Sequence, residues 1–271
     1  DYGSDLDIVL VYDERTAPPL RALAREEAYA RLAELMTAAL SSVTREGHLY
    51  RVDLRLRPDG KSGPVARGAQ SFVSYVSAQA GVWEWLAYVK LRAVGGDLEL
   101  GRAVEARARR ALHGAARRCD GEELRLETRR VRERLERERA RAGAGALDIK
   151  FGAGGMLDVY FAARYLQLRD RLPDEGDDRS TAATLARLRA AGSLDESEHA
   201  ALSEGYALLR RLDHRLRLTT GRSTRLPAAP DHPTLRDLAS ALGFASPAAL
   251  VATLRERTAS IRAAYERVTS G

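Results

Sequence analysis

Two aspartates at alternate positions open the first apolar run of the chain, and together they could bind a divalent cation. Asp5 and Asp7 occur in the segment DYGSDLDIVLVYD. Because side chains alternate along a strand, both carboxylates would lie on one face and Leu6 on the other if this segment is extended. Two neighbouring carboxylates repel each other, and a cation that prefers oxygen ligands would stabilise them. A D-x-D motif alone can also be a plain turn, so the motif needs a partner elsewhere in the chain.

A third aspartate lies in a second segment that alternates in polarity. In LYRVDLRLRP (49–58), apolar residues occupy one set of alternate positions and charged residues the other. Asp53 would therefore share its face of a strand with Arg55 and Arg57, and this charged face would meet the face that carries the first two aspartates. Three carboxylates on neighbouring strands form the donor set of a two-metal phosphoryl-transfer site.

This set of carboxylates predicts two Mg²⁺ ions and a nucleotide substrate. Asp5 and Asp7 would hold one ion on the phosphates, and Asp53 with one of them would hold a second ion that helps to deprotonate the attacking oxygen. Arg55 and Arg57 could each bind phosphate oxygens through two hydrogen bonds. A simple ion pair between Asp53 and a neighbouring arginine on a solvated face is the alternative interpretation.

The elements that must position these residues alternate between strand and helix. An interior strand is expected over 7–12, a helix over 18–44 and a second strand over 49–58. A glycine-rich loop follows, and then short helices in which Trp83 and Trp85 would anchor the core or an interface. The expected inner stripe of the first helix is Leu20, Ala24, Ala28, Leu32, Leu35, Met36 and Ala39.

The rest of the chain has the pattern of a helical bundle. Two polar helices are expected over about 98–117 and 122–142, and the second contains RRVRERLERERARA, in which arginine and glutamate alternate as on a solvated helix face. A glycine-rich break precedes further helices. Ser193 with Glu196 predicts a capping box, and Ser246 predicts the cap of the last helix. The apolar stripe of that last helix would be Leu250, Leu254, Ile261 and Val268.

These patterns predict an α+β fold in which a small mixed sheet with helices precedes an all-α helical bundle. The composition shift at Gly95, Gly96 and Asp97 suggests the first boundary. We expect a nucleotide-processing domain over 1–97, connecting helices over 98–145 and the bundle over 146–271.

The bulk composition excludes some classes of protein. Cys119 is the only cysteine of the 271 residues, so no disulfide can form within the chain. Without a signal-like or membrane-spanning apolar run, a cytoplasmic protein with no membrane partner is expected. The net charge is +6, yet arginines contribute 41 of the 44 basic residues and are interleaved with glutamates, and aromatic residues make up only 6%. Nucleic acid is therefore not the expected partner.

Several long motifs resemble one bacterial enzyme family. GSDLDIVLVYD, YRVDLRLRPDGKSGP and WEWLAYVKLRAVGGD resemble the nucleotidyltransferase domain of the glutamine synthetase adenylyltransferase/adenylyl-removing enzymes, a branch of the polymerase-β-like superfamily. DIKFGAGGMLDVYFAARYLQL and LRRLDHRLRLTTGRSTRLP resemble the helical domain that follows it, so the resemblance covers nearly the whole chain. It implies that Asp5, Asp7 and Asp53 are the metal-binding catalytic carboxylates and that Gly3 and Ser4 lead into them.

The resemblance also implies substrates and partners. One half of such an enzyme transfers AMP from ATP to a tyrosine of glutamine synthetase, and the other half removes it with phosphate, which yields ADP. A nitrogen-signalling regulatory protein is a further expected partner. The forms RPDGKSGP, YVKLRA and IKFGAGG are slightly closer to the adenylyl-removing half. Both directions use the same metal chemistry, so the direction stays open here.

Two departures from the family pattern stand out. The family carries a Gly-Gly element before the D-x-D strand, and this chain begins after it, so we expect a fragment of a longer enzyme. Tyr160 occupies a position where the family usually has an acidic residue, whereas Gly154, Gly155 and Asp158 keep the helical-domain motif. The glycines of KFGAGG could bind an anion at a helix N-terminus or simply turn the chain.

Weaker expectations concern Lys90 and Arg92, which could reach phosphates or pair with Glu84 at the surface. Two other functions stay open at this point. A nucleotidyltransferase that acts on RNA would show steep salt dependence of RNA binding. A non-catalytic regulatory or docking module that keeps the same fold would show no metal-dependent binding of nucleotide.

Overall fold

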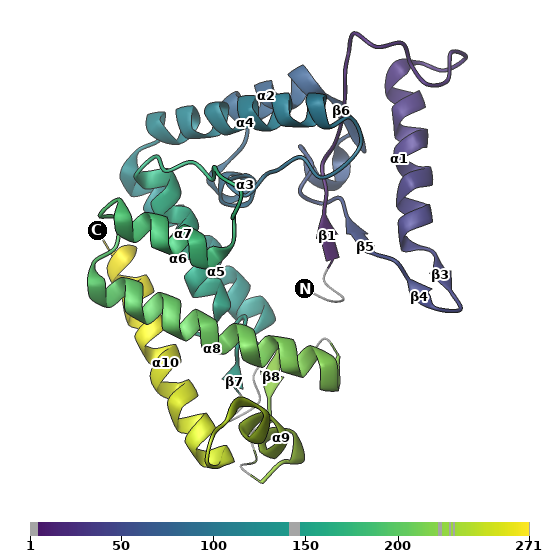
Figure 1. Cartoon of the computed structure of the whole chain (residues 1–271). Coiled ribbons are helices and arrows are strands. Elements are labelled where there is room, and N and C mark those ends of the chain that lie inside the picture. Colours follow the sequence, from purple (N-terminus) through teal and green to yellow (C-terminus); the bar gives the residue numbers. More distant parts are fainter. Residues whose placement is uncertain (1–4, 141–146, 222–223, 228, 230, 271) are drawn as a thin grey trace. The chain divides into compact units, whose positions relative to one another are not determined.

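The chain forms two compact units in the computed structural model, Asp1–Arg118 and Cys119–Gly271 (Figure 1). The structure describes residues 5–140, 147–221, 224–227, 229 and 231–270, so Gly3 and Ser4 lie outside the described residues. The division comes later than the composition shift at 95–97, because helix α4 (Leu98–Arg118) packs along α2 (Ala69–Ala78) in the first unit. The first unit contains both strands and helices, as in an α+β protein, and the second unit is mainly helical.

Parallel strand pairs form the centre of the first unit. Strand β1 (Asp5–Asp7) pairs with β5 (Arg51–Asp53), and β2 (Leu10–Tyr12) pairs with β6 (Ala66–Gly68). The expected strand over 7–12 is therefore two short strands, although the Ile8 N–H still donates to the Asp53 carbonyl at 3.0 Å. Because parallel partners need a crossover connection, helix α1 (Arg25–Ser41) carries the chain from β2 back toward β5.

The second predicted strand is shorter than its alternation suggests. It ends at Asp53, and the chain then turns, with the Arg57 N–H donating to the Leu54 carbonyl at 3.2 Å. The 3₁₀ turn η1 (Gly60–Ser62) follows before β6. Alternation alone therefore overestimated the strand, since a tight turn that buries Pro58 satisfies the same polarity pattern.

Helix α1 lies against β5 and β6, and its contacts are made by small side chains and by one tyrosine ring. Ala28 and Ala33 are buried, and Tyr29 stacks on Tyr12 with 4.2 Å between ring centroids. The predicted helix and its inner stripe are therefore partly wrong. The helix begins at Arg25, so Leu20 lies before it, and the helix approaches the sheet with its alanines while Leu32 (50%) and Leu35 (68%) stay exposed.

The remaining elements of the first unit complete its core. A short hairpin of β3 (Val43–Thr44) and β4 (Gly47–His48) follows α1, and α3 (Val82–Tyr88) follows α2. Trp85 is buried as expected, whereas Trp83 is 44% exposed. The predicted anchoring role therefore holds for one of the two tryptophans.

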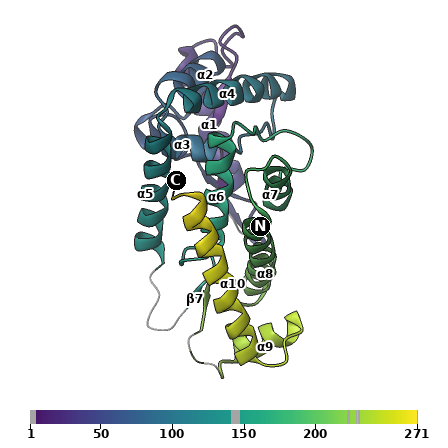
Figure 2. The same cartoon turned by 90° about the vertical axis from the view of Figure 1, so that its left-hand side faces the viewer.

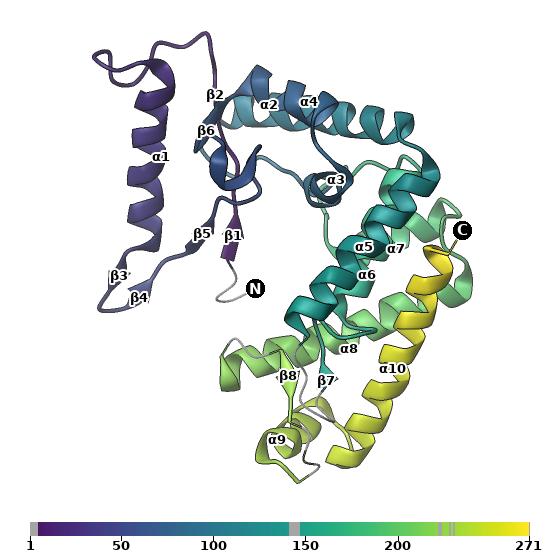
Figure 3. The same cartoon turned by 180° about the vertical axis from the view of Figure 1, so that it is seen from behind.

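The second unit is a helical bundle in which the last helix, α10 (Pro247–Val268), packs against α6, α8 and α9 (Figure 2). The predicted stripe of α10 is confirmed, because all four of its apolar residues are buried. A two-stranded antiparallel ladder joins β7 to β8. Figure 3 shows the same elements from behind. The other helices and strands of this unit are α5 (Gly121–Arg139), β7 (Leu147–Asp148), α6 (Met156–Arg169), α7 (Thr181–Ala190), α8 (Glu196–Thr220), β8 (Arg225–Leu226) and α9 (Pro233–Leu242).

Of the two helix caps predicted in the bundle, the one at α10 is confirmed and the one at α8 is wrong. Ser246 caps α10 as predicted, since its hydroxyl accepts from the Ala249 N–H at 3.1 Å. The predicted capping box at Ser193 is wrong. Asp195 and Glu198 form it instead, with each side chain accepting from the other's backbone N–H, at 2.7 and 3.0 Å.

Among the described helices none alone is long and apolar enough to cross a membrane, and only α9 and α10, bent by 76°, reach that length and composition jointly.

Candidate active site

Asp5, Asp7 and Asp53 lie on two adjacent parallel strands. The register pairs Asp7 directly with Asp53, Leu6 with Val52 and Asp5 with Arg51. Because paired residues of a parallel ladder share a face, the three aspartates lie on one face of β1 and β5, as the alternation predicted. Adjacent strands are separated by about 4.8 Å, so carboxylates of the paired aspartates can reach a common ion.

Arg55 contacts the carboxylate of Asp53 from the turn after β5. Its Nε donates to both oxygens, at 2.9 and 2.8 Å, its Nη2 donates to Oδ2, and its backbone N–H donates to Oδ1 at 2.9 Å. These hydrogen bonds hold the pKa of Asp53 below its ordinary value. The pKa of Arg55 is raised, chiefly by its bonds to Asp53 and then by the charges of Asp7 and Asp5. The guanidinium therefore lies in the field of all three aspartates.

The residue types suit Mg²⁺, but the side chains are not gathered around a common point. Carboxylate oxygens are its preferred protein ligands, and the strand register puts two of them side by side. Within the described part of the chain, however, no three acidic, histidine or cysteine side chains lie close enough together to hold a metal ion. Asp53 instead directs both oxygens toward Arg55. The residue types and the strand register fit the ion, whereas the Asp53 carboxylate is paired with Arg55 in this structure.

The guanidinium of Arg57, which the sequence suggests as a phosphate ligand, is bonded to backbone carbonyls in this structure. Its guanidinium donates to the carbonyl oxygens of Leu54 at 2.8 Å, Gly63 at 3.1 Å and Lys61 at 3.2 Å. These bonds hold the loop that follows β5. Arg57 thus positions the loop, and phosphate binding by this residue would require it to release backbone groups.

Lys90 and Arg92 lie just beyond the end of α3, which ends at Tyr88. Arg92 is exposed on this connection. The expected surface partner Glu84 is instead buried, and it accepts from the Tyr75 hydroxyl at 2.8 Å and from the Gly81 N–H at 3.0 Å. The pairing predicted for Glu84 is therefore wrong, because this carboxylate closes a buried hydrogen-bond network at the start of α3.

The helical-domain motif surrounds a buried ion pair in the second unit. Asp158 and Arg132 are both fully buried, and Arg132 Nε donates to Asp158 Oδ1. Arg132 Nη2 also donates to the Gly152 carbonyl at 2.8 Å, and Asp158 Oδ2 accepts from the Gly154 N–H at 2.7 Å. The glycine-rich turn therefore receives its anion from within the chain, in the form of the Asp158 carboxylate.

Sequence reasoning missed Arg132, which it placed on a solvated helix face. Leu124, Thr128 and Arg132 follow one another at intervals of four residues and are the buried residues of α5. This spacing was visible in the sequence and could have identified the arginine as an inward-facing residue. Arg262 on α10 extends the network, with Nη1 at 3.2 Å from Glu136 and 3.5 Å from Asp158.

Gly154 lies against the backbone of α10 and has a positive φ of 69°. A Cβ at this position would lie 1.8 Å from the Thr258 carbonyl oxygen. Gly154→Ala should therefore lower the free energy of unfolding by about 2 kcal/mol or more, since left-handed strain adds to the collision. Chemical denaturation followed by circular dichroism would measure this change.

Gly243→Ala is the matched control for that variant. Gly243 also has a positive φ, 78°, but nothing lies within 4 Å of a Cβ built there. This control should lose only the strain energy, about 1 kcal/mol. Equal losses in the two variants would contradict the close packing of Gly154 on α10.

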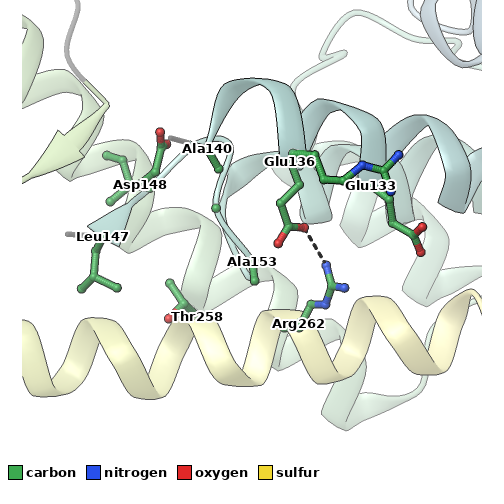
Figure 4. A pocket seen from close by; sticks show the side chains of 11 residues that line it. Glu133, Glu136, Ala140, Leu147, Asp148, Ala153, Thr258 and Arg262 are labelled. Atoms are coloured by element: carbon green, nitrogen blue, oxygen red, sulfur yellow. Dashed lines mark hydrogen bonds and ion pairs between the residues drawn. The ribbon is translucent and has the colours of Figure 1, made fainter. Parts of the chain in front are cut away.

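A cavity of about 700 Å³ lies beside this network in the second unit (Figure 4). Its walls come from the end of α5, from β7 with the glycine-rich turn, and from α10. Glu136 and Arg262 pair across it, as the dashed line in Figure 4 shows. The three predicted catalytic aspartates do not line it.

Two family models match the chain, one for each unit. The model described as glutamate-ammonia ligase adenylyltransferase matches residues 1–107. The model described as GlnD PII-uridylyltransferase matches residues 126–269, which is most of the helical unit. The first match includes all three aspartates, and the second includes the buried network of Asp158.

Curated relatives match nearly the whole chain. A bifunctional glutamine synthetase adenylyltransferase/adenylyl-removing enzyme from Caulobacter vibrioides is 35% identical over 99% of this chain and 27% of its own length. Proteins of the same name are 32% identical in Burkholderia mallei, over 98% of this chain and 30% of the relative, and 33% identical in Xanthobacter autotrophicus, over 98% and 27%. The chain thus spans less than a third of the length of these relatives.

Proposed function

Because this chain belongs to the family of glutamine synthetase adenylyltransferases/adenylyl-removing enzymes, we propose that its first unit is a Mg²⁺-dependent nucleotidyltransferase of the polymerase-β-like type. The observation that carries the proposal is the parallel register of Asp7 with Asp53, which puts Asp5 on the same face. We propose residues 1–97 as the catalytic domain, 98–145 as its connection and 146–271 as the helical domain.

The substrate that we propose is a tyrosine of glutamine synthetase together with a nucleotide. In one direction the tyrosine oxygen attacks the α-phosphorus of ATP, a new P–O bond forms, and pyrophosphate leaves with the electrons of the broken bond. In the other direction a phosphate oxygen attacks the phosphorus of the tyrosine–AMP ester, the tyrosine oxygen leaves, and ADP forms. The shared displacement at phosphorus explains how one set of carboxylates could serve either reaction.

Each part of the proposed site has a defined task. Asp5, Asp7 and Asp53 would hold the ions, which when bound neutralise phosphate charge and favour the deprotonated nucleophile. Arg57 fixes the loop after β5 through three backbone carbonyls. Lys90 and Arg92, with Gly3 and Ser4 before β1, are proposed to contact the nucleotide phosphates. Catalysis would then rest on positioning and charge neutralisation.

The helical unit would serve regulation in this proposal. Its match to a PII-uridylyltransferase model supports a nitrogen-signalling protein as a regulatory partner. Gly154, Gly155 and Asp158 would contribute by holding the glycine-rich turn in place, since their contacts lie within the unit. The proposed role of these three residues is therefore structural.

Removal of divalent cations should abolish the activity. We expect transfer of label from α-³²P-ATP to a bacterial glutamine synthetase, or phosphate-dependent release of label from the adenylylated enzyme, with Mg²⁺ and no reaction with excess EDTA. Restored Mg²⁺ should restore the rate. Labelling of glutamine synthetase and RNA in parallel would identify the acceptor.

The alternative functions predict different results from this assay. Absence of both reactions, combined with no Mg²⁺-dependent binding of ATP, would overturn the enzyme proposal and favour a docking module. Label on RNA rather than on glutamine synthetase would overturn the proposed acceptor.

A further inference from the structure

Arg55 occupies an unusual position for a residue expected to bind phosphate. It makes four hydrogen bonds to one carboxylate, and that carboxylate is a proposed ligand of the catalytic ion. The Asp53 side chain is 13% exposed, whereas that of Arg55 is 61% exposed. The arginine therefore covers the aspartate from the solvent side.

We propose that Arg55 is the internal counter-ion of the aspartate site, and that its guanidinium must leave Asp53 before a divalent cation can bind all three carboxylates. This inference rests on the proposed function of the three aspartates. It adds a role to Arg55 that differs from phosphate binding: competition with the cation for the same oxygens.

The geometry supports competition rather than mere proximity. A carboxylate has two oxygens, and the Arg55 Nε donates to both of Asp53 while the backbone N–H of Arg55 takes a further position on Oδ1. A metal ion that approached Asp53 from the shared face would need at least one of these lone pairs. Two positive groups cannot occupy the same position, so the ion and the guanidinium exclude each other.

The surrounding charges explain why a positive group belongs there. The negative charges of Asp5 and Asp7 act on the Arg55 guanidinium together with that of Asp53, and the Lys61 charge acts on Asp53 from the following loop. Without a cation, the arginine offsets repulsion between the paired strands at Asp7 and Asp53. Once displaced, its exposed guanidinium is free to meet an incoming phosphate.

Divalent-ion titration tests this proposal directly. Mn²⁺ binding by calorimetry should be about two- to fivefold tighter in Arg55→Gln than in the wild-type chain, a factor typical of the loss of an exposed ion pair. Arg45→Gln is the matched control. Arg45 is exposed in the β3–β4 turn, and its substitution removes the same charge from the same unit. The control should bind Mn²⁺ with wild-type affinity.

Further variants separate the possible outcomes. Arg55→Lys keeps the charge but cannot make the two-pronged contact, so its affinity should lie between those of wild type and Arg55→Gln. Circular dichroism would confirm that each variant is folded, and Arg55→Lys alone carries the test if Arg55→Gln does not fold. Mn²⁺ affinity that is equal or weaker in both Arg55 variants would overturn the counter-ion role.

The result also distinguishes this inference from the proposed function on which it rests. If Mn²⁺ binds the wild type, is lost in Asp53→Asn and is unaffected by either Arg55 substitution, the metal site stands and the counter-ion role fails. If the wild type does not bind Mn²⁺, or Asp53→Asn binds it equally well, the metal site itself fails and the counter-ion role falls with it.

Discussion

Asp7→Asn should reduce AMP transfer or removal by about 100-fold to 1,000-fold, which corresponds to about 3–4 kcal/mol of lost transition-state stabilisation. Asp7 faces Asp53 across the parallel ladder, so its carboxylate is the one that both proposed ions would share. An amide keeps the shape of the side chain but loses the negative charge that binds the cation. Steady-state rates at saturating Mg²⁺ would measure the effect.

The thermal stability of the same variant gives an independent readout. Removing one of several neighbouring carboxylates relieves repulsion, so the melting temperature should stay unchanged or rise. Asp13→Asn is a suitable control, because Asp13 forms a surface ion pair with Arg15 at 2.8 Å and lies beyond β2. Near wild-type rates in Asp7→Asn would remove this carboxylate from the mechanism, and an equal loss of rate in the control would point to a general charge effect.

Asp158→Ala should lower the free energy of unfolding of the helical unit by about 3–5 kcal/mol. The substitution leaves the Arg132 guanidinium fully buried without its main anion and leaves the Gly154 N–H without its acceptor. Glu136, 3.2 Å from Arg132, can compensate for only part of the lost charge. Urea denaturation followed by circular dichroism would measure the change.

A surface ion pair provides the control for this variant, because water can replace the lost partner there. Asp170 lies 2.7 Å from Arg169 and both side chains are partly exposed, so Asp170→Ala should cost less than about 1 kcal/mol. A loss of that small size in Asp158→Ala would mean that the buried network contributes little. A double variant that also replaces Arg132 with methionine should recover part of the stability, because no unpaired charge would remain.

The helices of the bundle were the most predictable part of the fold. The apolar stripe of α10 and its Ser246 cap follow from local spacing and from one hydroxyl, and both are confirmed. The exposed Leu32 and Leu35 of α1 show the limit of such reasoning. Periodicity locates an apolar face, but the choice between leucines and alanines as the contact depends on how closely the sheet approaches, which only the tertiary structure defines.

For the candidate site, sequence reasoning located the aspartates but not their contacts. Alternation placed Asp53 on the correct face of β5, whereas the early turn at 54–57 folds Arg55 back onto it. Strand propensity does not encode that turn. Arg132 illustrates the same difficulty in α5, because a run of arginine and glutamate hides one inward-facing position unless the spacing from Leu124 is followed.

The parallel pairing of β1 with β5 also has a consequence for the order in which the protein acquires its chemistry. Asp7 and Asp53 are distant in the chain, and α1 with its hairpin must be traversed before the two strands can meet. Contacts of such large sequence separation form late, since the intervening segment must first lose its chain entropy. A nascent chain that has emerged only through β1 therefore holds two of the three proposed ligand carboxylates, and Asp53 joins them only when the parallel pairing forms.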